Sequence, residues 1–177
     1  MTDRPSPPPG AQPTPKGASP RRIALFAVAA VFLLDQLSKY LVAYQLALPQ
    51  QGAIRLTSFF DFRWEENRGT AMSMFVAGNE TERWLLVAFT GAICSGIALW
   101  LWREKRAGQA VALGILLGGA LGNVADRIIH GFVVDFADLH IGNWRPFNIF
   151  NLADVAITIG VLLLLFSAVF QHKRPPA

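Results

Sequence analysis

The chain has 177 residues, of which 53% are hydrophobic and only 16% are charged, and its mean hydropathy is +0.36. Soluble domains carry about 25% charged residues, so this composition argues against an ordinary soluble fold and favours a membrane protein. The net charge of +4 does not indicate a nucleic-acid-binding protein, because the basic residues form short clusters between apolar runs. A single cysteine, Cys94, excludes an intrachain disulfide, and the histidines lack metal-ligand spacing.

Residues 1–20 are rich in Pro, Ala, Ser and Gly and offer little to bury, so they predict a disordered tail. This tail is not a signal peptide, because the apolar run begins late and carries its own Asp and Lys. Residues 21–171 are predicted to form one four-helix membrane domain, and residues 172–177 a second short tail.

Four apolar segments, near 22–44, 84–102, 110–129 and 152–170, each approach the roughly 20 residues that cross a bilayer. With four spans, every basic cluster falls on one side, as the positive-inside rule requires. The clusters are Lys16, Arg21 and Arg22; Arg103, Lys105 and Arg106; and Lys173 and Arg174. Both tails are therefore predicted to be cytoplasmic, and the two long connections, 45–83 and 130–150, to face outward.

Two further patterns complete the predicted fold, an all-α membrane protein of four transmembrane helices with a small outer sheet. Residues 53–64 are aromatic and β-branched with partial alternation, which favours short strands over a helix. The third span carries glycines at small-residue spacing, which favours close helix packing rather than ligand binding. These glycines are Gly114, Gly118, Gly119 and Gly122.

Several ionisable residues fall near the outer ends of the spans, where a carboxylate beside lipid is a functional-site hypothesis. Asp35 and Lys39 are four apart and can pair on one helix face, while Asp126 is followed at once by Arg127. These cations favour ionised carboxylates and an architectural role.

Asp135 and Asp154 stand among apolar residues without a local cation. Burial of this kind favours the protonated form of a carboxyl, as a pair sharing one proton requires. The pattern therefore predicts that these two residues are an acid and a base acting together. Asp126 as the partner of Asp154 is the alternative pairing, and purely structural helix cross-linking is the alternative role.

Three asparagines, Asn67, Asn123 and Asn151, accompany these charges and are costly in lipid unless they are hydrogen-bonded. They could hold an extended peptide or stabilise an oxyanion, or they could serve as turn and capping residues. Ser38 and Lys39 are adjacent, point in different directions on a helix, and so do not form a Ser/Lys pair. The rival functions are a proton-coupled transporter or channel subunit and a non-catalytic scaffold.

Five blocks in order give the chain a resemblance to the lipoprotein signal peptidase (signal peptidase II) family, over nearly all residues after the tail. The blocks are Asp35-Gln36-Leu37-Ser38-Lys39, Asn67-Arg68-Gly69-Thr70-Ala71, Gly122-Asn123-Val124-Ala125-Asp126-Arg127, Val133-Val134-Asp135-Phe136 and Phe150-Asn151-Leu152-Ala153-Asp154. The resemblance implies a membrane-embedded aspartic endopeptidase that cuts bacterial prolipoproteins before a diacylglyceryl-modified cysteine.

The resemblance also implies that Asp135 and Asp154 are catalytic, with no metal or cofactor. It implies an extracytoplasmic β-cradle built from the first outer loop, a multi-pass location in the bacterial inner membrane and inhibition by globomycin. A monomer suffices for these features. The residues that it implies shape the site or hold substrate are Asp35, Lys39, Asn67, Arg68, Asn123, Asp126, Arg127 and Asn151.

Overall fold

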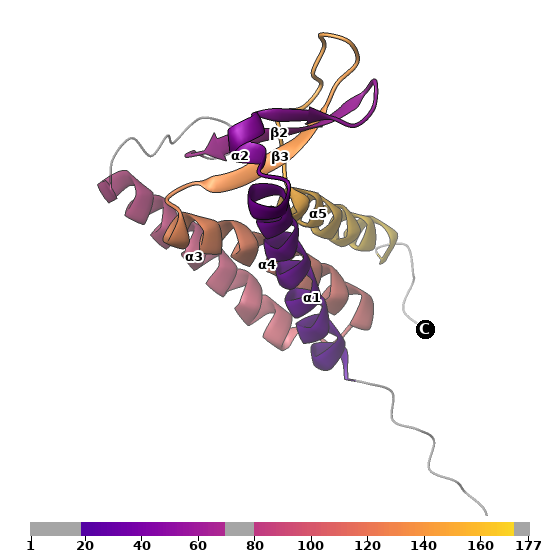
Figure 1. The fold of residues 1–177 in the computed structure, drawn as a ribbon. Coiled ribbons are helices and arrows are strands. Elements are labelled where there is room, and N and C mark those ends of the chain that lie inside the picture. Colours follow the sequence, from indigo (N-terminus) through magenta and orange to yellow (C-terminus); the bar gives the residue numbers. More distant parts are fainter. Residues whose placement is uncertain (1–18, 70–79, 172–177) are drawn as a thin grey trace, which may run out of the picture.

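A computed structural model describes residues 19–69 and 80–171, so most of both predicted tails lies outside the described residues. Within the described part, four helices are long and apolar enough to cross a membrane, as predicted (Figure 1). They are α1 (Pro20–Tyr40), extended by a π-helical turn η1 (Leu41–Gln45), and α3 (Glu80–Arg103), α4 (Ala107–Ile129) and α5 (Leu152–Gln171).

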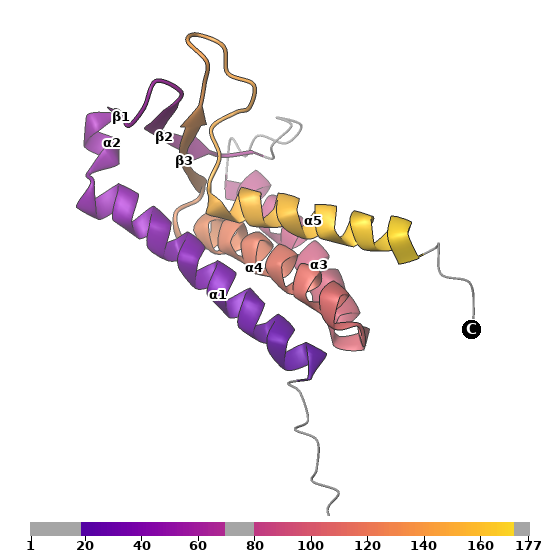
Figure 2. The ribbon, with the colours of Figure 1, turned by 90° about the vertical axis from the view of Figure 1, so that its right-hand side faces the viewer.

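Helix α4 is the central helix, and α1, α3 and α5 all pack against it (Figure 2). The predicted role of its glycines is confirmed, because they bring neighbouring backbones into close contact. A Cβ at Gly118 would lie 2.8 Å from the Val28 carbonyl oxygen of α1. A Cβ at Gly119 would lie 2.6 Å from the Ala153 carbonyl oxygen of α5. Only a residue without a side chain permits these approaches.

The outward faces of α1, α3 and α5 carry large apolar side chains that the protein itself does not cover. Leu33, Leu85 and Leu162 are 63%, 64% and 59% exposed. In water such continuous apolar faces would be unfavourable, whereas hydrocarbon covers them without cost. These exposed apolar faces and the length of the four helices are those of a multi-pass membrane bundle.

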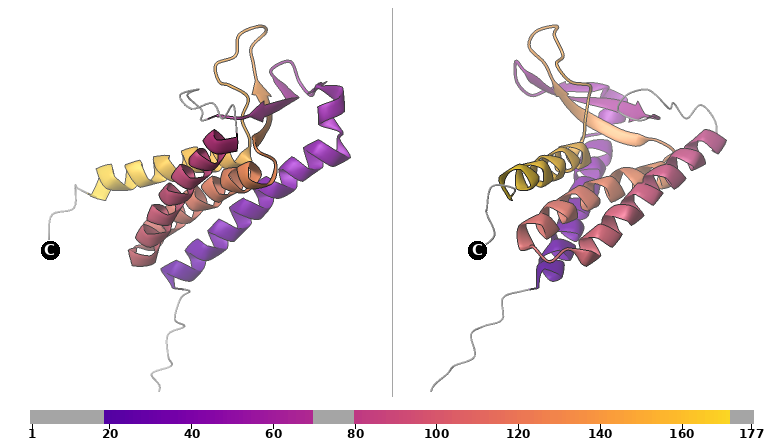
Figure 3. Two further views of the ribbon diagram at one scale, coloured as in Figure 1. Left: turned by 90° about the vertical axis from the view of Figure 1, so that its left-hand side faces the viewer. Right: turned by 180° about the vertical axis from the view of Figure 1, so that it is seen from behind.

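A three-stranded antiparallel sheet lies across one end of the bundle (Figure 3). Its strands are β1 (Ala53–Arg55), β2 (Phe60–Asn67) and β3 (Val133–Leu139), in that order, and the short helix α2 (Leu48–Gln51) precedes them. The strands at 53–64 were predicted. The first long connection supplies β1 and β2 as expected, and the second long connection adds a third strand, β3, that was not predicted.

Strand β3 joins the sheet to the bundle because it follows α4 after a short turn and precedes α5. Its apolar residues pack into a small core with the residues that lead from α1 into the sheet. Val134, Phe136 and Ala137 of β3 meet Val42 of η1 and Leu48 of α2 there. Strand β3 is thus buried along most of its length, which fixes any side chain that it presents to the bundle.

Candidate active site

Asp135 and Asp154, the predicted pair, come from β3 and from the first turn of α5 and line one cavity of about 680 Å³. Asp135 is 2% exposed, and Asn151 and Asn67 each donate a hydrogen bond to it, at 2.6 and 2.9 Å. Asp154 accepts a hydrogen bond of 2.9 Å from the Asn123 side chain. Each of the three asparagines thus contacts one of the two acids.

The position of Asn67 depends on a β-bulge between β2 and β3. The strands pair Phe62 with Ala137 but Glu65 with Asp135, so β2 has one extra residue. A shift of one residue turns the following side chains to the other face of a sheet. Without the bulge, Asn67 and Asp135 would project from opposite faces. With it, they form a diagonal cross-strand pair and the hydrogen bond is made.

Asn151 and Asp154 cap the start of α5 reciprocally. The Asp154 backbone N–H donates to Asn151 Oδ1 at 3.0 Å, and the Asn151 N–H donates to Asp154 Oδ2 at 3.1 Å. This is the capping-box arrangement, which satisfies two N–H groups that a helix start leaves free. The predicted capping role of Asn151 is confirmed, and its amide nitrogen still reaches Asp135. One residue therefore connects both carboxyl groups.

The surroundings of Asp135 favour its protonated form. Burial, and next the negative charge of Asp154, raise the pKa of Asp135 from 3.8 to about 7, against the hydrogen bonds from Asn67 and Asn151. Asp154 itself lies in the first turn of α5. Asp135 can therefore hold a proton near neutral pH with a second carboxyl group in the same cavity, an arrangement that suits paired acid and base groups.

The rest of the cavity wall is largely apolar. Its apolar side chains come from β3, from the connection to α5 and from α5 itself. The apolar wall residues are Val133, Leu139, Phe147, Ile149, Phe150, Val155, Ile157 and Ile159. The cavity therefore offers a bound molecule both a lipophilic wall and a small number of polar groups.

Asp35, Lys39 and Asp126 form a separate, buried ion-pair cluster between α1 and α4. Lys39 Nζ lies 2.8 Å from a carboxylate oxygen of Asp35 and 2.8 Å from one of Asp126. The i,i+4 pairing of Asp35 with Lys39 is confirmed. Arg127 as the cation for Asp126 is wrong, because Arg127 points elsewhere. Adjacent residues on a helix diverge, so the charge comes from α1 instead.

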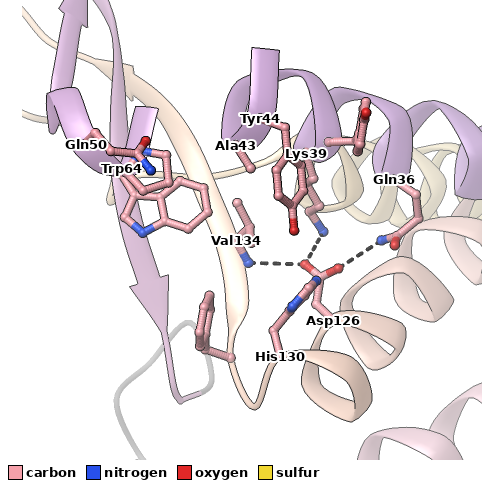
Figure 4. Close-up of a pocket in the computed structure, with 12 residues that line it drawn as sticks. Gln36, Lys39, Ala43, Tyr44, Gln50, Trp64, Asp126, His130 and Val134 are labelled. Carbon is pink, nitrogen blue, oxygen red and sulfur yellow. Dashed lines mark hydrogen bonds and ion pairs between the residues drawn. The ribbon is translucent and has the colours of Figure 1, made fainter. Parts of the chain in front are cut away.

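Asp126 faces a second cavity, of about 470 Å³, beside Lys39, Gln36 and Val134 (Figure 4). Val134 lines this cavity, whereas its neighbours Val133 and Asp135 line the cavity of the acid pair. Successive residues of a strand point to opposite faces, so β3 separates the two cavities. Asp126 is therefore not placed as the partner of Asp154.

Arg127 and Arg68 have different surroundings, although both were predicted site residues. Arg127 lines the cavity of the acid pair and donates to the Gly69 carbonyl oxygen at 2.7 Å. Arg68 has a side chain that is 60% exposed and pairs with Glu66 at 2.8 Å. Among the described residues that line the cavity, Arg68 does not appear. Ser38 donates to the Asp35 carbonyl oxygen, which agrees with the exclusion of a Ser/Lys pair.

Two polar residues of this region escaped the sequence analysis. Gln36 donates to Asp126 at 2.9 Å, and it lies within the block Asp35–Lys39 that was considered for its charges alone. Arg83 donates to the carbonyl oxygens of Arg127 and Ile128, at 2.9 and 2.7 Å, and so satisfies the end of α4. The sequence signal that could have identified Arg83 is its position as a single arginine beside the second predicted span.

Comparisons with known proteins agree with this geometry. A sequence model of the family described as signal peptidase (SPase) II matches residues 27–170. The lipoprotein signal peptidase of Rhizorhabdus wittichii is 56% identical over 154 residues, which cover 86% of this chain and 90% of that protein. That of Sphingopyxis alaskensis is 53% identical over 153 residues, covering 86% and 88%.

The fold is similar to that of solved proteins as well. A bacterial membrane enzyme determined by the in meso method at 2.3 Å resolution superposes with a TM-score of 0.74 and 26% identity. The match covers 87% of this chain and 93% of that enzyme. With the family match over most of the sequence, these findings establish that the chain belongs to the signal peptidase II family.

Proposed function

We propose that this protein removes signal peptides from bacterial prolipoproteins and that Asp135 and Asp154 are its catalytic acid and base. One observation carries the proposal. Two carboxyl groups from different elements line one cavity, each is held by neutral amides, and burial together with the charge of Asp154 raises the pKa of Asp135. Both acids come from a single chain, so a monomer is sufficient. Family membership supports the substrate class.

In the proposed mechanism, Asp154 is ionised and takes a proton from a water molecule as its oxygen attacks the scissile carbonyl carbon. Protonated Asp135 donates its proton to the carbonyl oxygen, which gives a neutral tetrahedral diol. Asp154 then passes the proton it received to the leaving nitrogen, and Asp135 recovers a proton as the carbonyl re-forms and the C–N bond breaks.

The amides that hold the acids also suit an extended peptide. Asn123 and Asn151 lie between the two carboxyl groups, and Arg127 holds the Gly69 carbonyl at the same cavity. Their donors can keep a substrate backbone and the developing diol in place. The apolar wall on α5 suits the acyl chains of a diacylglyceryl cysteine, so cleavage falls just before that residue.

The proposed orientation places the sheet and the acid pair outside the cytoplasm. Arg21 stacks on the Trp102 ring at 5.0 Å, so the basic residues at the start of α1 and at the end of α3 share the end opposite the sheet. Positive residues favour the cytoplasmic side of a membrane. Both termini are then cytoplasmic, and the buried charges lie at the outer face of the inner membrane.

The test is cleavage of a diacylglyceryl-modified precursor peptide by the protein reconstituted in lipid, beside the same peptide without its lipid. We expect the lipidated peptide to be cut before its cysteine, the other peptide to be cut poorly, and globomycin to inhibit. Asp135→Asn and Asp154→Asn should retain the fold and lose cleavage. Full cleavage by both variants would contradict the aspartic mechanism, and equal cleavage of both peptides would contradict the lipid requirement.

A further inference from the structure

The ion-pair cluster of α1 and α4 makes two backbone contacts that lead directly to the acid pair. Asp35 accepts a hydrogen bond of 2.9 Å from the N–H of Ala153, the residue before Asp154. Asp126 accepts one of 3.1 Å from the N–H of Val134, the residue before Asp135 (Figure 4). Each buried carboxylate of the cluster thus holds the peptide unit next to one acid of the pair.

Lys39 joins these two contacts to each other. Its ammonium group lies 2.8 Å from both carboxylates and donates a third hydrogen bond, of 3.2 Å, to Asn123 Oδ1. Asn123 in turn donates to Asp154 from its other amide atom. All three ammonium protons therefore have an acceptor, and each acceptor is in direct contact with the acid pair or its neighbouring backbone.

The cluster has little freedom to move. Asp35, Lys39 and Asp126 are 0%, 4% and 2% exposed. Gly122 lies directly against the Asp35 carboxylate, where any side chain would collide with it. Buried ion pairs with satisfied hydrogen bonds hold one geometry because breaking any partner leaves a charge uncompensated. Contacts of this kind can fix the positions of the neighbouring backbone in β3 and α5.

We infer that Asp35, Lys39 and Asp126 form a positioning bracket that sets the separation and orientation of Asp135 and Asp154. The inference rests on the proposed function of that pair. A simple tie between α1 and α4 requires only the contact of Lys39 with Asp126. The contacts to Ala153 and Val134 are additional, and they fall at equivalent positions, one residue before each acid.

The decisive variant makes the bracket neutral without removing its acceptors, namely Asp35→Asn with Lys39→Met and Asp126→Asn. Each asparagine keeps an oxygen for its backbone N–H, while the links through the ammonium group are lost. Misplacement of reacting groups by about 1 Å lowers turnover on the order of 100-fold. We expect kcat for the lipidated peptide to fall roughly 10- to 100-fold, with KM changed less than about threefold, because the cavity wall stays intact.

Asp138→Asn is the matched control. Asp138 lies three residues after Asp135 in the same strand, is 0% exposed and pairs with Arg145 and Arg63 at 3.0 and 3.5 Å. Its loss removes buried ion pairs from β3 at a point remote from the bracket. We expect this variant to lose thermal stability and to keep the wild-type kcat.

A folded triple variant with wild-type kcat would overturn the inference, and so would a rise in KM equal to the fall in kcat. An equal loss of kcat in Asp138→Asn would also overturn it. If the triple variant does not accumulate, the single variants Asp35→Asn and Asp126→Asn serve as the test. A wild-type kcat in both single variants would overturn the inference. If Asp135→Asn and Asp154→Asn still cleave, the proposed function fails instead of the bracket.

Discussion

Two pairs of acids lie at the same end of the helix bundle in the described part of the chain, and they differ in the groups that donate hydrogen bonds to them. Asp35 and Asp126 share the ammonium group of Lys39. Asp135 and Asp154 receive hydrogen bonds from the uncharged amides of Asn67, Asn123 and Asn151.

This difference separates a structural role from a chemical one for the same residue type. A carboxylate that is bonded to a buried ammonium group and to backbone N–H groups holds its neighbours in place. A carboxyl group that has only amide donors and another acid nearby can gain and lose a proton near neutral pH. The boundary between the two groups is a single strand, β3, whose alternate residues face opposite cavities.

The largest effect should follow removal of the proton-carrying pair. Asp135→Asn and Asp154→Asn should each lower kcat by about 10⁴-fold, at the upper end of what general acid–base groups contribute. Because the two acids act together in a single step, the double variant should be no slower than either single one. Rate measurements under saturating lipidated peptide test this. Multiplicative losses in the double variant would show that the acids work independently.

Removal of the Lys39 ammonium group should first lower the free energy of unfolding. Lys39→Met leaves Asp35 and Asp126 buried without their partner, so we expect a loss of about 3–5 kcal/mol in free energy of unfolding. The measurement is reversible unfolding in detergent, with Lys105→Met as the control on an exposed lysine. A loss below 1 kcal/mol in Lys39→Met would mean that water or another group already compensates these charges.

The raised pKa of Asp135 predicts the pH dependence of both rate and stability. The acid must be protonated to act, so kcat should decline as pH rises through about 7. A folded-state pKa above the unfolded value of 3.8 contributes stability that is complete below pH 3.8 and lost as pH rises toward 7. The Tm should therefore fall between pH 4 and pH 7 and level off above.

Asp135→Asn is the variant that sharpens this prediction. It removes the titrating group, so the fall in Tm between pH 4 and pH 7 should become shallower than in the wild type. The slope of the free energy of unfolding against pH should change by up to about 1.4 kcal/mol per pH unit at 25 °C. Asp138→Asn, in the same strand, should keep the wild-type slope. An unchanged slope in Asp135→Asn would assign the titration to another group.

Much of the fold could be predicted from the sequence because the bilayer imposes simple rules on length and charge. The four spans agree with the observed helices within a few residues, and the glycines of α4 lie where backbones touch. Strand β3 was not predicted, because Val133–Leu139 reads as an apolar run with two acids rather than as an alternating strand. Its partner strand lies more than 60 residues earlier.

The site was predictable in its residues and less so in its contacts. Isolation from cations singled out Asp135 and Asp154 correctly as the residues that share a cavity. The choice of Arg127 as the cation for Asp126 failed because sequence adjacency says nothing about partners from another helix. The Asn67 contact depends on a bulge of one residue, and no local sequence signal fixes the register of two strands from separate loops.

The smallest effect should come from Arg68, which the family resemblance placed at the site. Its side chain is 60% exposed and its ion pair with Glu66 faces solvent, where such pairs contribute between about 0 and 1 kcal/mol. Arg68→Ala should therefore change kcat/KM less than about twofold. Asn67→Ala is the contrast next to it in sequence, since it leaves Asp135 Oδ2 without its donor and should lower kcat roughly tenfold or more. Equal losses of kcat in the two variants would mean that residues 67–69 act as one unit. Exposed Arg68 would then contribute to the site as much as Asn67, and the distinction between the two residues would fail.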